Sequence, residues 1–352
     1  MDEAALNPDS LPATKPTSRR RLFVLGLAIV ALVLMFLFFL CWYLMIYAPG
    51  ESFQGQPSEF EKPQVTLRDE LYEHVDHLSV RIGERNLANY PALQKAANYV
   101  QQQLEASGYE VARQEFEVNK LACFNLDAGI RGRTSPDEVV LIGAHYDTAP
   151  KTPGANDNAS GIAALLALAR HFSDVKTDRT LRFVAFTNEE PPYFHSERMG
   201  SLVYARRSRE WDENLVAVLS LETIGYFTNE PNSQLYPAPF DAFYPAEGSF
   251  IGIVGNVSSR PLVHRVIDSF RRHAEFPSEA GALPGNITGV GWSDHWSFWQ
   301  EGYQAVMITD TAPFRYPYYH HVNDTPDKLQ FEEMTRVVEG LKGVVEDLTS
   351  SD

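Results

Sequence analysis

The stretch GAHYDT at residues 143–148, followed by GANDNASG at residues 154–161, is the part of the sequence around which the chain is organised. It follows the apolar run VVLI at 139–142, which predicts a buried strand, and precedes IAALLALA at 162–169, which predicts a buried helix. A strand that ends in His and Asp, and a loop that brings a second Asp to a helix start, can supply the first ligands of a metal site. Such a site needs further ligands from other parts of the chain.

Composition limits the classes of protein to which the chain can belong. Its 352 residues suffice for one large domain or two ordinary ones. The formal net charge of −16 argues against nucleic acid or an anionic membrane surface as the partner of the folded part. The two cysteines, Cys41 and Cys123, lie far apart in the sequence, so they predict neither a disulfide framework nor a cysteine-ligated zinc site.

An N-terminal apolar segment predicts a membrane anchor. Residues 22–48 contain no charged residue and, as a helix, are long enough to span the roughly 30 Å hydrocarbon core. Three arginines at 19–21 precede the segment, and Trp42 and Tyr43 lie near its far end, where aromatic rings favour the interface. The positive-inside rule therefore predicts a cytoplasmic N-terminus and an extracytoplasmic C-terminal part. A cleaved signal peptide is the alternative, but the apolar run is longer than such a peptide requires.

The chain is expected to divide into four parts: a polar cytoplasmic tail (1–21), a transmembrane helix (22–48), a linker (49–66) and a folded domain (67–352). In the folded domain, runs with strand character alternate with helical patterns. This alternation predicts an α/β fold with a mostly parallel mixed sheet and helices on both faces. Residues 225–248 and 276–292 are expected to be long loops that wall the site.

The expected secondary structure can be given element by element. Helices are predicted at 67–81, 91–107, 159–172, 197–208, 261–274, 293–301 and 329–348. Strands are predicted at 110–118, 123–130, 138–144, 180–187, 215–221, 249–254 and 304–309. Ligand sites of such sheets lie at the carboxyl ends of the strands, which is where the chemically active residues should meet.

Candidate ligands begin at the end of the first predicted parallel strand. His145 and Asp147 lie two apart, and alternate residues of an extended chain point the same way, so Asp147 can accept a hydrogen bond from His145 and fix its tautomer. A surface turn explains this His-x-Asp pattern equally well. Asp157 precedes a helix, where it could bind a metal or simply cap the helix.

Further candidates follow the later strands. The adjacent Glu189 and Glu190 are either solvated surface residues or a working pair, in which one binds a metal while the other takes a proton from metal-bound water. Glu222 closes another strand, and the histidine pair 320–321 lies in the loop before the last helix.

The combined set has two histidines and three or four carboxylates at the ends of four or five strands. Such ligands suit zinc, cobalt or manganese. Two ions that share one carboxylate, roughly 3.5–4 Å apart, can hold a hydroxide between them and polarise a carbonyl group.

Five motifs, in this order, resemble those of the co-catalytic di-zinc peptidases, a family that includes bacterial leucyl aminopeptidase, glutamate carboxypeptidase and glutaminyl cyclase. They are His145-x-Asp147, GANDNASG at 154–161, Glu189-Glu190, Ser-Leu-Glu222, and Tyr319-His320 followed by Asp324-Thr325. The resemblance covers roughly residues 67 to 350, and the combined pattern is highly specific.

The resemblance implies which residues bind the metals. Asp157 would bridge two zinc ions. His145 and Glu222 would complete the site of one ion, and Glu190 and His320 that of the other. The chain departs from the family at position 222, where Asp is frequent and this sequence has the longer Glu.

The resemblance also implies three residues that take part in catalysis without completing a metal site. Glu189 would be the general base, and Asp147 would orient His145. Tyr319 resembles a tyrosine that stabilises the tetrahedral oxyanion in some members.

Two further assignments rest on the family pattern. The family's histidine lies four residues before the Asp of the Asp-Thr pair, which selects His320 rather than His321, because the Asp is Asp324. The segment 293–295, Ser-Asp-His, also resembles a family element near the site, and a polar first turn of a helix is the alternative.

The sequence thus predicts a membrane-anchored, zinc-dependent exopeptidase, and among exopeptidases an aminopeptidase, which uses a metal-bridging hydroxide with Glu189 as the general base. The alternatives are a glutaminyl-cyclase-like transferase, a carboxypeptidase and a catalytically inactive receptor-like homologue. The expected cofactors are two Zn²⁺ ions, with Co²⁺ or Mn²⁺ as substitutes. The expected partners are a peptide substrate and, through residues 22–48, a membrane, with no nucleic acid. The expected location is a single-pass membrane position with the catalytic domain outside the cytoplasm.

Overall fold

The computed structural model describes residues 18–351, which divide into two units between Leu44 and Met45. In its described part, the first unit consists of helix α1 (Ser18–Met45) up to that boundary. Its span Arg21–Met45 is 25 residues long, has a mean hydropathy of 3.1 and buries none of its most apolar window. By length and composition it could cross a membrane. The part of the predicted tail at 1–17 lies outside the described residues.

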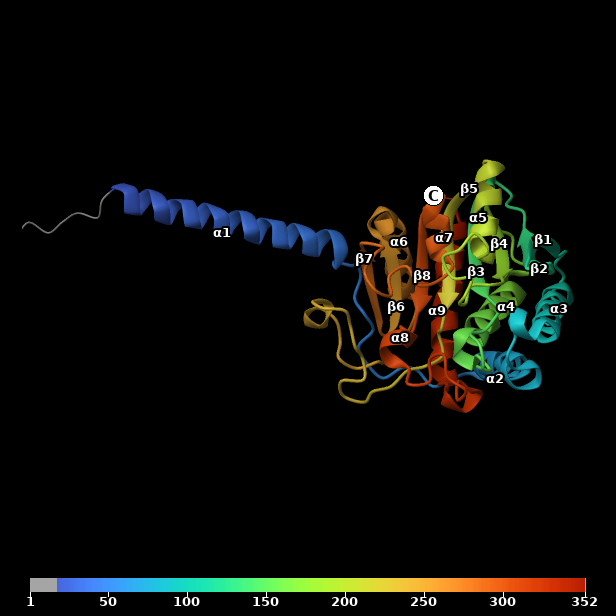
Figure 1. The fold of residues 1–352 in the computed structure, drawn as a ribbon. Coiled ribbons are helices and arrows are strands. Elements are labelled where there is room, and N and C mark those ends of the chain that lie inside the picture. Colours follow the sequence, from blue (N-terminus) through green and yellow to red (C-terminus); the bar gives the residue numbers. More distant parts are fainter. Residues whose placement is uncertain (1–17, 352) are drawn as a thin grey trace, which may run out of the picture. The chain divides into compact units, whose positions relative to one another are not determined.

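The second unit is built on a single sheet of eight strands in the order β1-β2-β4-β3-β5-β8-β6-β7 (Figure 1). The strands are β1 (Ala112–Val118), β2 (Leu121–Ile130), β3 (Ser135–His145), β4 (Arg179–Phe186), β5 (Asn214–Glu222), β6 (Ile251–Asn256), β7 (Ser278–Leu283) and β8 (Ala305–Thr309). The central strands β4, β3, β5 and β8 pair in parallel, as do β6 and β7, whereas the β1–β2, β2–β4 and β6–β8 pairs are antiparallel. The predicted α/β fold with a mixed sheet is confirmed.

Helices cover both faces of this sheet (Figure 1). They are α2 (Lys62–Asp76), α3 (Tyr90–Ala106), α4 (Gly161–Phe172), α5 (Gly200–Glu210), α6 (Arg260–His273), α7 (His295–Gln300), α8 (Ala312–Arg315) and α9 (Phe331–Thr349). The larger core lies between one face and helices α2, α3, α4, α6 and α9. A smaller core lies on the opposite face, beneath α5 and α7.

The alternation of side chains along β3 shows how the sequence specifies these two layers. Val140 and Ile142 point into the larger core, while Val139 and Leu141 point into the smaller one. All four are buried, so the strand reads as a continuous apolar run, as expected of a parallel strand covered on both faces. His145 ends this run at the carboxyl edge of the sheet.

Two differences from the sequence prediction concern element boundaries. Strand β7 (Ser278–Leu283) lies inside the predicted loop 276–292, because its sequence SEAGAL has small and polar residues and therefore weak strand character. The helix predicted at 67–81 is α2, which begins at Lys62 with Pro63 in its first turn. The strands predicted at 110–118 and 123–130 are confirmed as β1 and β2, which pair as an antiparallel hairpin.

Candidate metal centre and active site

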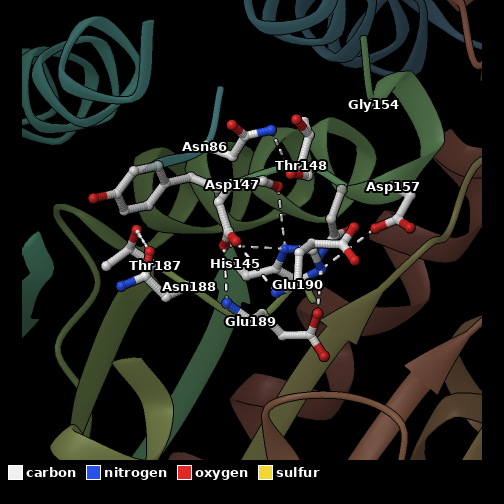
Figure 2. A network of polar contacts seen from close by, with 12 residues as sticks. Asn86, His145, Asp147, Thr148, Gly154, Asp157, Thr187, Asn188, Glu189 and Glu190 are labelled. Carbon is white, nitrogen blue, oxygen red and sulfur yellow. Dashed lines mark hydrogen bonds and ion pairs between the residues drawn. The ribbon is translucent and has the colours of Figure 1, made fainter. Parts of the chain in front are cut away.

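Predicted site residues meet at the carboxyl ends of three neighbouring parallel strands. Figure 2 shows five of them: His145, Asp147, Asp157, Glu189 and Glu190. His145 is the last residue of β3, and Glu222 is the last residue of β5. Glu189 and Glu190 follow the end of β4, on the other side of β3. Asp157 comes from a short irregular segment (Ala155–Ser160) that leads into α4. Parallel pairing brings these strand ends to one edge, which is why residues distant in sequence meet there.

One group of potential ligands is formed by His145, Asp157 and Glu222, all of them buried. Nε2 of His145 lies 3.2 Å from Oε2 of Glu222 and 3.5 Å from Oδ1 of Asp157. The longer side chain of Glu222, compared with Asp, therefore still reaches the group.

A second group consists of Asp157, Glu190 and His320. Nε2 of His320 lies 3.1 Å from Oδ2 of Asp157 and 3.2 Å from Oε2 of Glu190. The two groups share Asp157, which directs one carboxylate oxygen to each histidine. His321 turns away, because its Nδ1 accepts a hydrogen bond from the backbone N–H of Asn323 at 3.2 Å.

Asp147 contacts His145 and the turn after β4. One carboxylate oxygen lies within ion-pair distance of Nδ1 of His145, at 3.6 Å, and Nδ1 is also 3.3 Å from the backbone carbonyl oxygen of Asp147. The two carboxylate oxygens also accept hydrogen bonds from the backbone N–H groups of Glu189 and Glu190, at 3.1 and 3.2 Å (Figure 2). Asp147 therefore positions the turn that carries both glutamates.

Three non-glycine residues at or next to the candidate ligands adopt positive φ angles. Asn188 (φ 59°) precedes Glu189, Thr223 (φ 45°) follows Glu222, and His320 itself has φ 55°. This conformation is uncommon for such residues and costs about 1–3 kcal/mol at each of them. Backbone strain of this kind concentrates at functional sites, where the surrounding contacts enforce it.

Asp324 is a site residue whose role was not predicted from the sequence. Its position in the sequence served only to select His320 rather than His321. Its buried carboxylate accepts hydrogen bonds from the backbone N–H groups of Asn156, at 2.8 Å, and Asp157, at 3.1 Å. The hydroxyl of Tyr316 donates to the same carboxylate at 2.8 Å. Asp324 thus fixes the backbone of the residue that the two groups share.

Arg85 is a second residue that was missed. It is completely buried, and its guanidinium donates to the backbone carbonyl oxygens of Tyr146 (2.7 Å), Pro153 (2.6 Å) and Gly154 (2.9 Å). Burial lowers the pKa of Arg85 to about 10, and the carboxylates of Asp324 and other acids of the site oppose that shift. The side chain holds both ends of the loop between β3 and Asp157 in place.

The segment 293–295 and Tyr319 border the candidate ligands. The hydroxyl of Ser293 donates to Oε2 of Glu222 at 2.7 Å, so this serine supports Glu222, whereas His295 points elsewhere, with Nε2 2.8 Å from the carbonyl oxygen of Val290. The ring of Tyr319 stacks on that of His320, with centroids 3.9 Å apart, and lines a cavity together with Glu222.

The electrostatics of the cluster show an excess of negative charge. Burial raises the pKa of Glu189 well above its ordinary value, because it disfavours the charged form and because Glu222 and Glu190 repel a further negative charge. Burial and the charge of Asp157 raise the pKa of Glu190 to about 8. Burial would lower the pKa of His145, but Glu222 and Glu189 raise it well above the ordinary value. Cations bound among these groups would relieve the repulsion.

Replacement of Asp324 tests the importance of its contacts. Asp324→Ala leaves two backbone N–H groups without acceptors, so we expect the free energy of unfolding to fall by about 2–4 kcal/mol and metal affinity to fall with it. Urea unfolding in detergent, with and without added Zn²⁺, measures both effects. Tyr316→Phe, which removes one hydrogen bond to the same carboxylate, should cost about 1 kcal/mol. If Asp324→Ala changed neither the free energy of unfolding nor the metal affinity, the assigned role of Asp324 would be wrong.

Comparison with known proteins gives a consistent picture. Residues 125–345 match the family described as peptidase family M28. The protein YfbL of Escherichia coli (strain K12) is 33% identical over 322 residues, which cover 89% of this chain and 96% of that protein. A zinc aminopeptidase from Bacillus subtilis has a similar fold, with a TM-score of 0.65 at 15% identity over 81% of this chain and 95% of its own. So does glutaminyl cyclase from Fimbriiglobus ruber, with a TM-score of 0.61 at 21% identity over 83% and 99%.

Proposed function

This chain belongs to peptidase family M28, and we propose that it is a membrane-anchored zinc aminopeptidase that removes residues from the amino ends of peptides. The single observation that carries the proposal is the pair of potential ligand groups that share Asp157, with Glu189 beside them and outside both groups. The family membership gives the reaction class, hydrolysis of a peptide bond. The site gives the chemistry by which this chain would perform it.

The residues present fit two zinc ions. Each group offers one histidine nitrogen and two carboxylates, a donor set that zinc accepts, and the donor atoms within a group all lie within 4.8 Å of one another. Asp157, His145 and Glu222 would hold one ion, and Asp157, Glu190 and His320 the other. When bound, zinc ions supply Lewis acidity, which lowers the pKa of water and polarises the substrate carbonyl.

Glu189 is the residue best placed to move protons. Its Oε2 lies 3.9 Å from Nε2 of His145, so it borders the ligand group but is not needed to complete it. Its raised pKa suits a carboxylate that takes a proton from the attacking water and then gives it to the leaving amine nitrogen. The Asp147 carboxylate, through the backbone N–H of Glu189, holds this base at the end of β4.

Tyr319 is proposed to stabilise the negative charge that develops on the carbonyl oxygen. Its ring stacks on His320, so its position depends on that of a candidate ligand. Burial raises the pKa of Tyr319 well above its ordinary value, and neighbouring carboxylates such as Asp157 add to the shift. The hydroxyl therefore keeps its proton and can donate a hydrogen bond.

Other functions within the same fold are less well supported. A glutaminyl-cyclase-like transferase with one zinc ion would need only one of the two ligand groups, and both are present. An inactive receptor-like homologue would have no need of the base, yet Glu189 is retained beside the ligands. A carboxypeptidase is distinguished from an aminopeptidase by its substrates.

Helix α1 is proposed as the membrane anchor. The three arginines at 19–21 precede its apolar span and favour a cytoplasmic N-terminus, which would place the catalytic domain outside the cytoplasm. Protease accessibility of the catalytic domain in intact cells and in lysed cells tests this orientation. If the catalytic domain were digested only after lysis, the proposed orientation would be wrong.

The substrates test the proposed activity directly. We expect the full-length protein in detergent, supplied with Zn²⁺, to cleave dipeptide amides with a free amino end at least 100-fold faster than their N-acetylated counterparts, because exopeptidase sites accept a chain end. Product analysis gives kcat/KM for each substrate, and metal analysis of the same sample should give two zinc ions per chain. Cleavage of the acetylated substrates alone would rule out an aminopeptidase.

A further inference from the structure

A second structural feature adjoins the candidate ligands: an apolar cavity whose floor is the sheet itself. Glu222 on β5 is paired with Thr309 on β8, Thr309 with Gly252 on β6, and Gly252 with Glu279 on β7. Residues paired in this way share one face of a sheet, and all four line the cavity. A straight row of residues therefore leads from a candidate metal ligand to a second glutamate at the sheet edge.

The cavity has glycines in its floor and bulky side chains in its walls. A Cβ atom at Gly252 would lie 3.3 Å from the carbonyl oxygen of Thr309, and one at Gly281 would lie 3.0 Å from the Tyr244 hydroxyl oxygen. A larger residue at either position would crowd these atoms and make the cavity shallower. The walls come from the loops after β5, β7 and β8, and they include Tyr236, Phe240, Tyr244, Ile287 and Phe314. The loops at 225–248 and 276–292, which were predicted to wall the site, contribute to this lining, whereas the contribution of the loop after β8 was not predicted.

Glu279 has an unusual position in this apolar setting. Among the described residues that line the cavity, Glu222 and Glu279 are the only charged ones. Within residues 18–351 no hydrogen bond or ion pair of the Glu279 carboxylate is found. Arg271 is the nearest influence of opposite sign, but its guanidinium donates to the backbone carbonyl oxygens of Pro49, Gly50 and Ser278. The cavity thus ends in a carboxylate whose counter-charge is not supplied by its own walls.

The spacing between the two glutamates fits a long side chain. Neighbouring strands lie about 4.8 Å apart, so the backbones of Glu222 and Glu279 are about 14 Å apart across three steps of the sheet. An extended lysine side chain reaches about 6 Å from its Cα, and arginine slightly further. Two further distances make up the rest of the separation between the two glutamates. One is the contact between the cationic head and Glu279, and the other runs from the substrate Cα to the scissile carbonyl beside Glu222.

We infer that this cavity is the specificity pocket of the enzyme and that it selects a lysine or arginine side chain on the residue whose carbonyl is attacked, with Glu279 as the charge partner. This inference rests on the proposed aminopeptidase activity. The aromatic walls would pack along the aliphatic part of the side chain, and the cationic head would meet Glu279. A shorter apolar side chain would leave that carboxylate unpaired, and an acidic one would be repelled.

The test compares lysyl with norleucyl substrates, which differ mainly in the charged head. We expect the wild-type protein to cleave lysyl and arginyl amides with a higher kcat/KM than norleucyl amide. In Glu279→Gln, kcat/KM for the lysyl amide should fall about 10- to 100-fold, the size expected for a hydrogen bond to a charged group, while that for norleucyl amide stays within about twofold. Glu247→Gln is the matched control, because Glu247 is exposed and does not line the cavity. This substitution should change kcat/KM for neither substrate.

A binding measurement separates this inference from the proposed activity. Titration calorimetry of the amino alcohols lysinol and norleucinol, which have no bond to hydrolyse, with the zinc-loaded wild type and Glu279→Gln requires no turnover. Weaker binding of lysinol alone in the variant supports the pocket, even if no substrate is cleaved and the proposed activity fails. Equal affinities for the two amino alcohols in the wild type, or equal losses in the variant, would overturn the charge-selective pocket whether or not the enzyme is an aminopeptidase.

Discussion

Glu189→Gln is expected to lower kcat by about 10²- to 10⁴-fold while leaving the zinc content of the protein unchanged. The amide keeps the size and shape of the side chain, and Glu189 lies outside both ligand groups. It cannot, however, take a proton from water. The backbone N–H of residue 189 would still donate to Asp147, so the turn at the end of β4 should keep its shape. Steady-state kinetics and metal analysis on the same preparation measure both quantities.

The neighbouring glutamate provides the control for this prediction. Glu190→Gln makes the same chemical change one residue later, but Glu190 belongs to a ligand group, 3.2 Å from Nε2 of His320. It should therefore lose zinc as well as activity. If Glu189→Gln also lost zinc, or if it retained turnover, the assignment of Glu189 as the base and Glu190 as the ligand would be wrong.

Much of the site could be predicted because its residues end apolar strands. His145 and Glu222 each follow a buried run, and parallel neighbours bring their carboxyl ends together. The position of a strand end is thus recorded locally in the sequence, as a polar residue after several apolar ones. The connections between the strands limit the possible strand orders but do not fix the position of β8 between β5 and β6.

Other parts of the site depend on contacts that no local pattern records. The Arg85 guanidinium donates to backbone carbonyl oxygens, of which those of Tyr146 and Gly154 are more than sixty residues away, and a carbonyl has no signature in the sequence. Asp324 likewise acts on backbone N–H groups, those of Asn156 and Asp157. Such residues organise loops, and the fold must be known before their partners are.

Strand β7 shows a similar limit for the fold. Its residues Ser278–Leu283 have little strand propensity, and the strand exists because β6 offers an edge with which it can pair. The register of that pairing places Glu279 opposite Gly252 and so decides the far end of the cavity. A feature on which the proposed substrate selection depends thus arises from tertiary structure alone.

Asp157→Asn is expected to abolish binding of both zinc ions and to reduce hydrolysis to background. Asp157 is the residue that the two ligand groups share, and each histidine approaches a different one of its carboxylate oxygens. Asparagine keeps the shape of the side chain but replaces one of those oxygens with an amide nitrogen, which cannot bind a metal while it carries its protons, and it leaves the other as an uncharged oxygen, which is a weaker ligand for a cation. His320→Ala, which removes a ligand from one group only, should retain the ion held by His145 and Glu222. Metal analysis after dialysis should give two ions for the wild type, one for His320→Ala and none for Asp157→Asn.

Thermal unfolding should distinguish the same three proteins. An ion that binds only the folded state, at 1,000 times its Kd, stabilises that state by about 4 kcal/mol, so chelation should lower the Tm of the wild type most and that of His320→Ala less. The Tm of Asp157→Asn should not respond to chelator. Burial would raise the pKa of Asp157, but its contacts with His320 and His145 lower it below the ordinary value, so the charge of Asp157 stabilises the metal-free folded state at neutral pH. We therefore expect Asp157→Asn to be less stable than the metal-free wild type. An equal stability would mean that the repulsion between Asp157 and the carboxylates of Glu190 and Glu222 offsets these contacts.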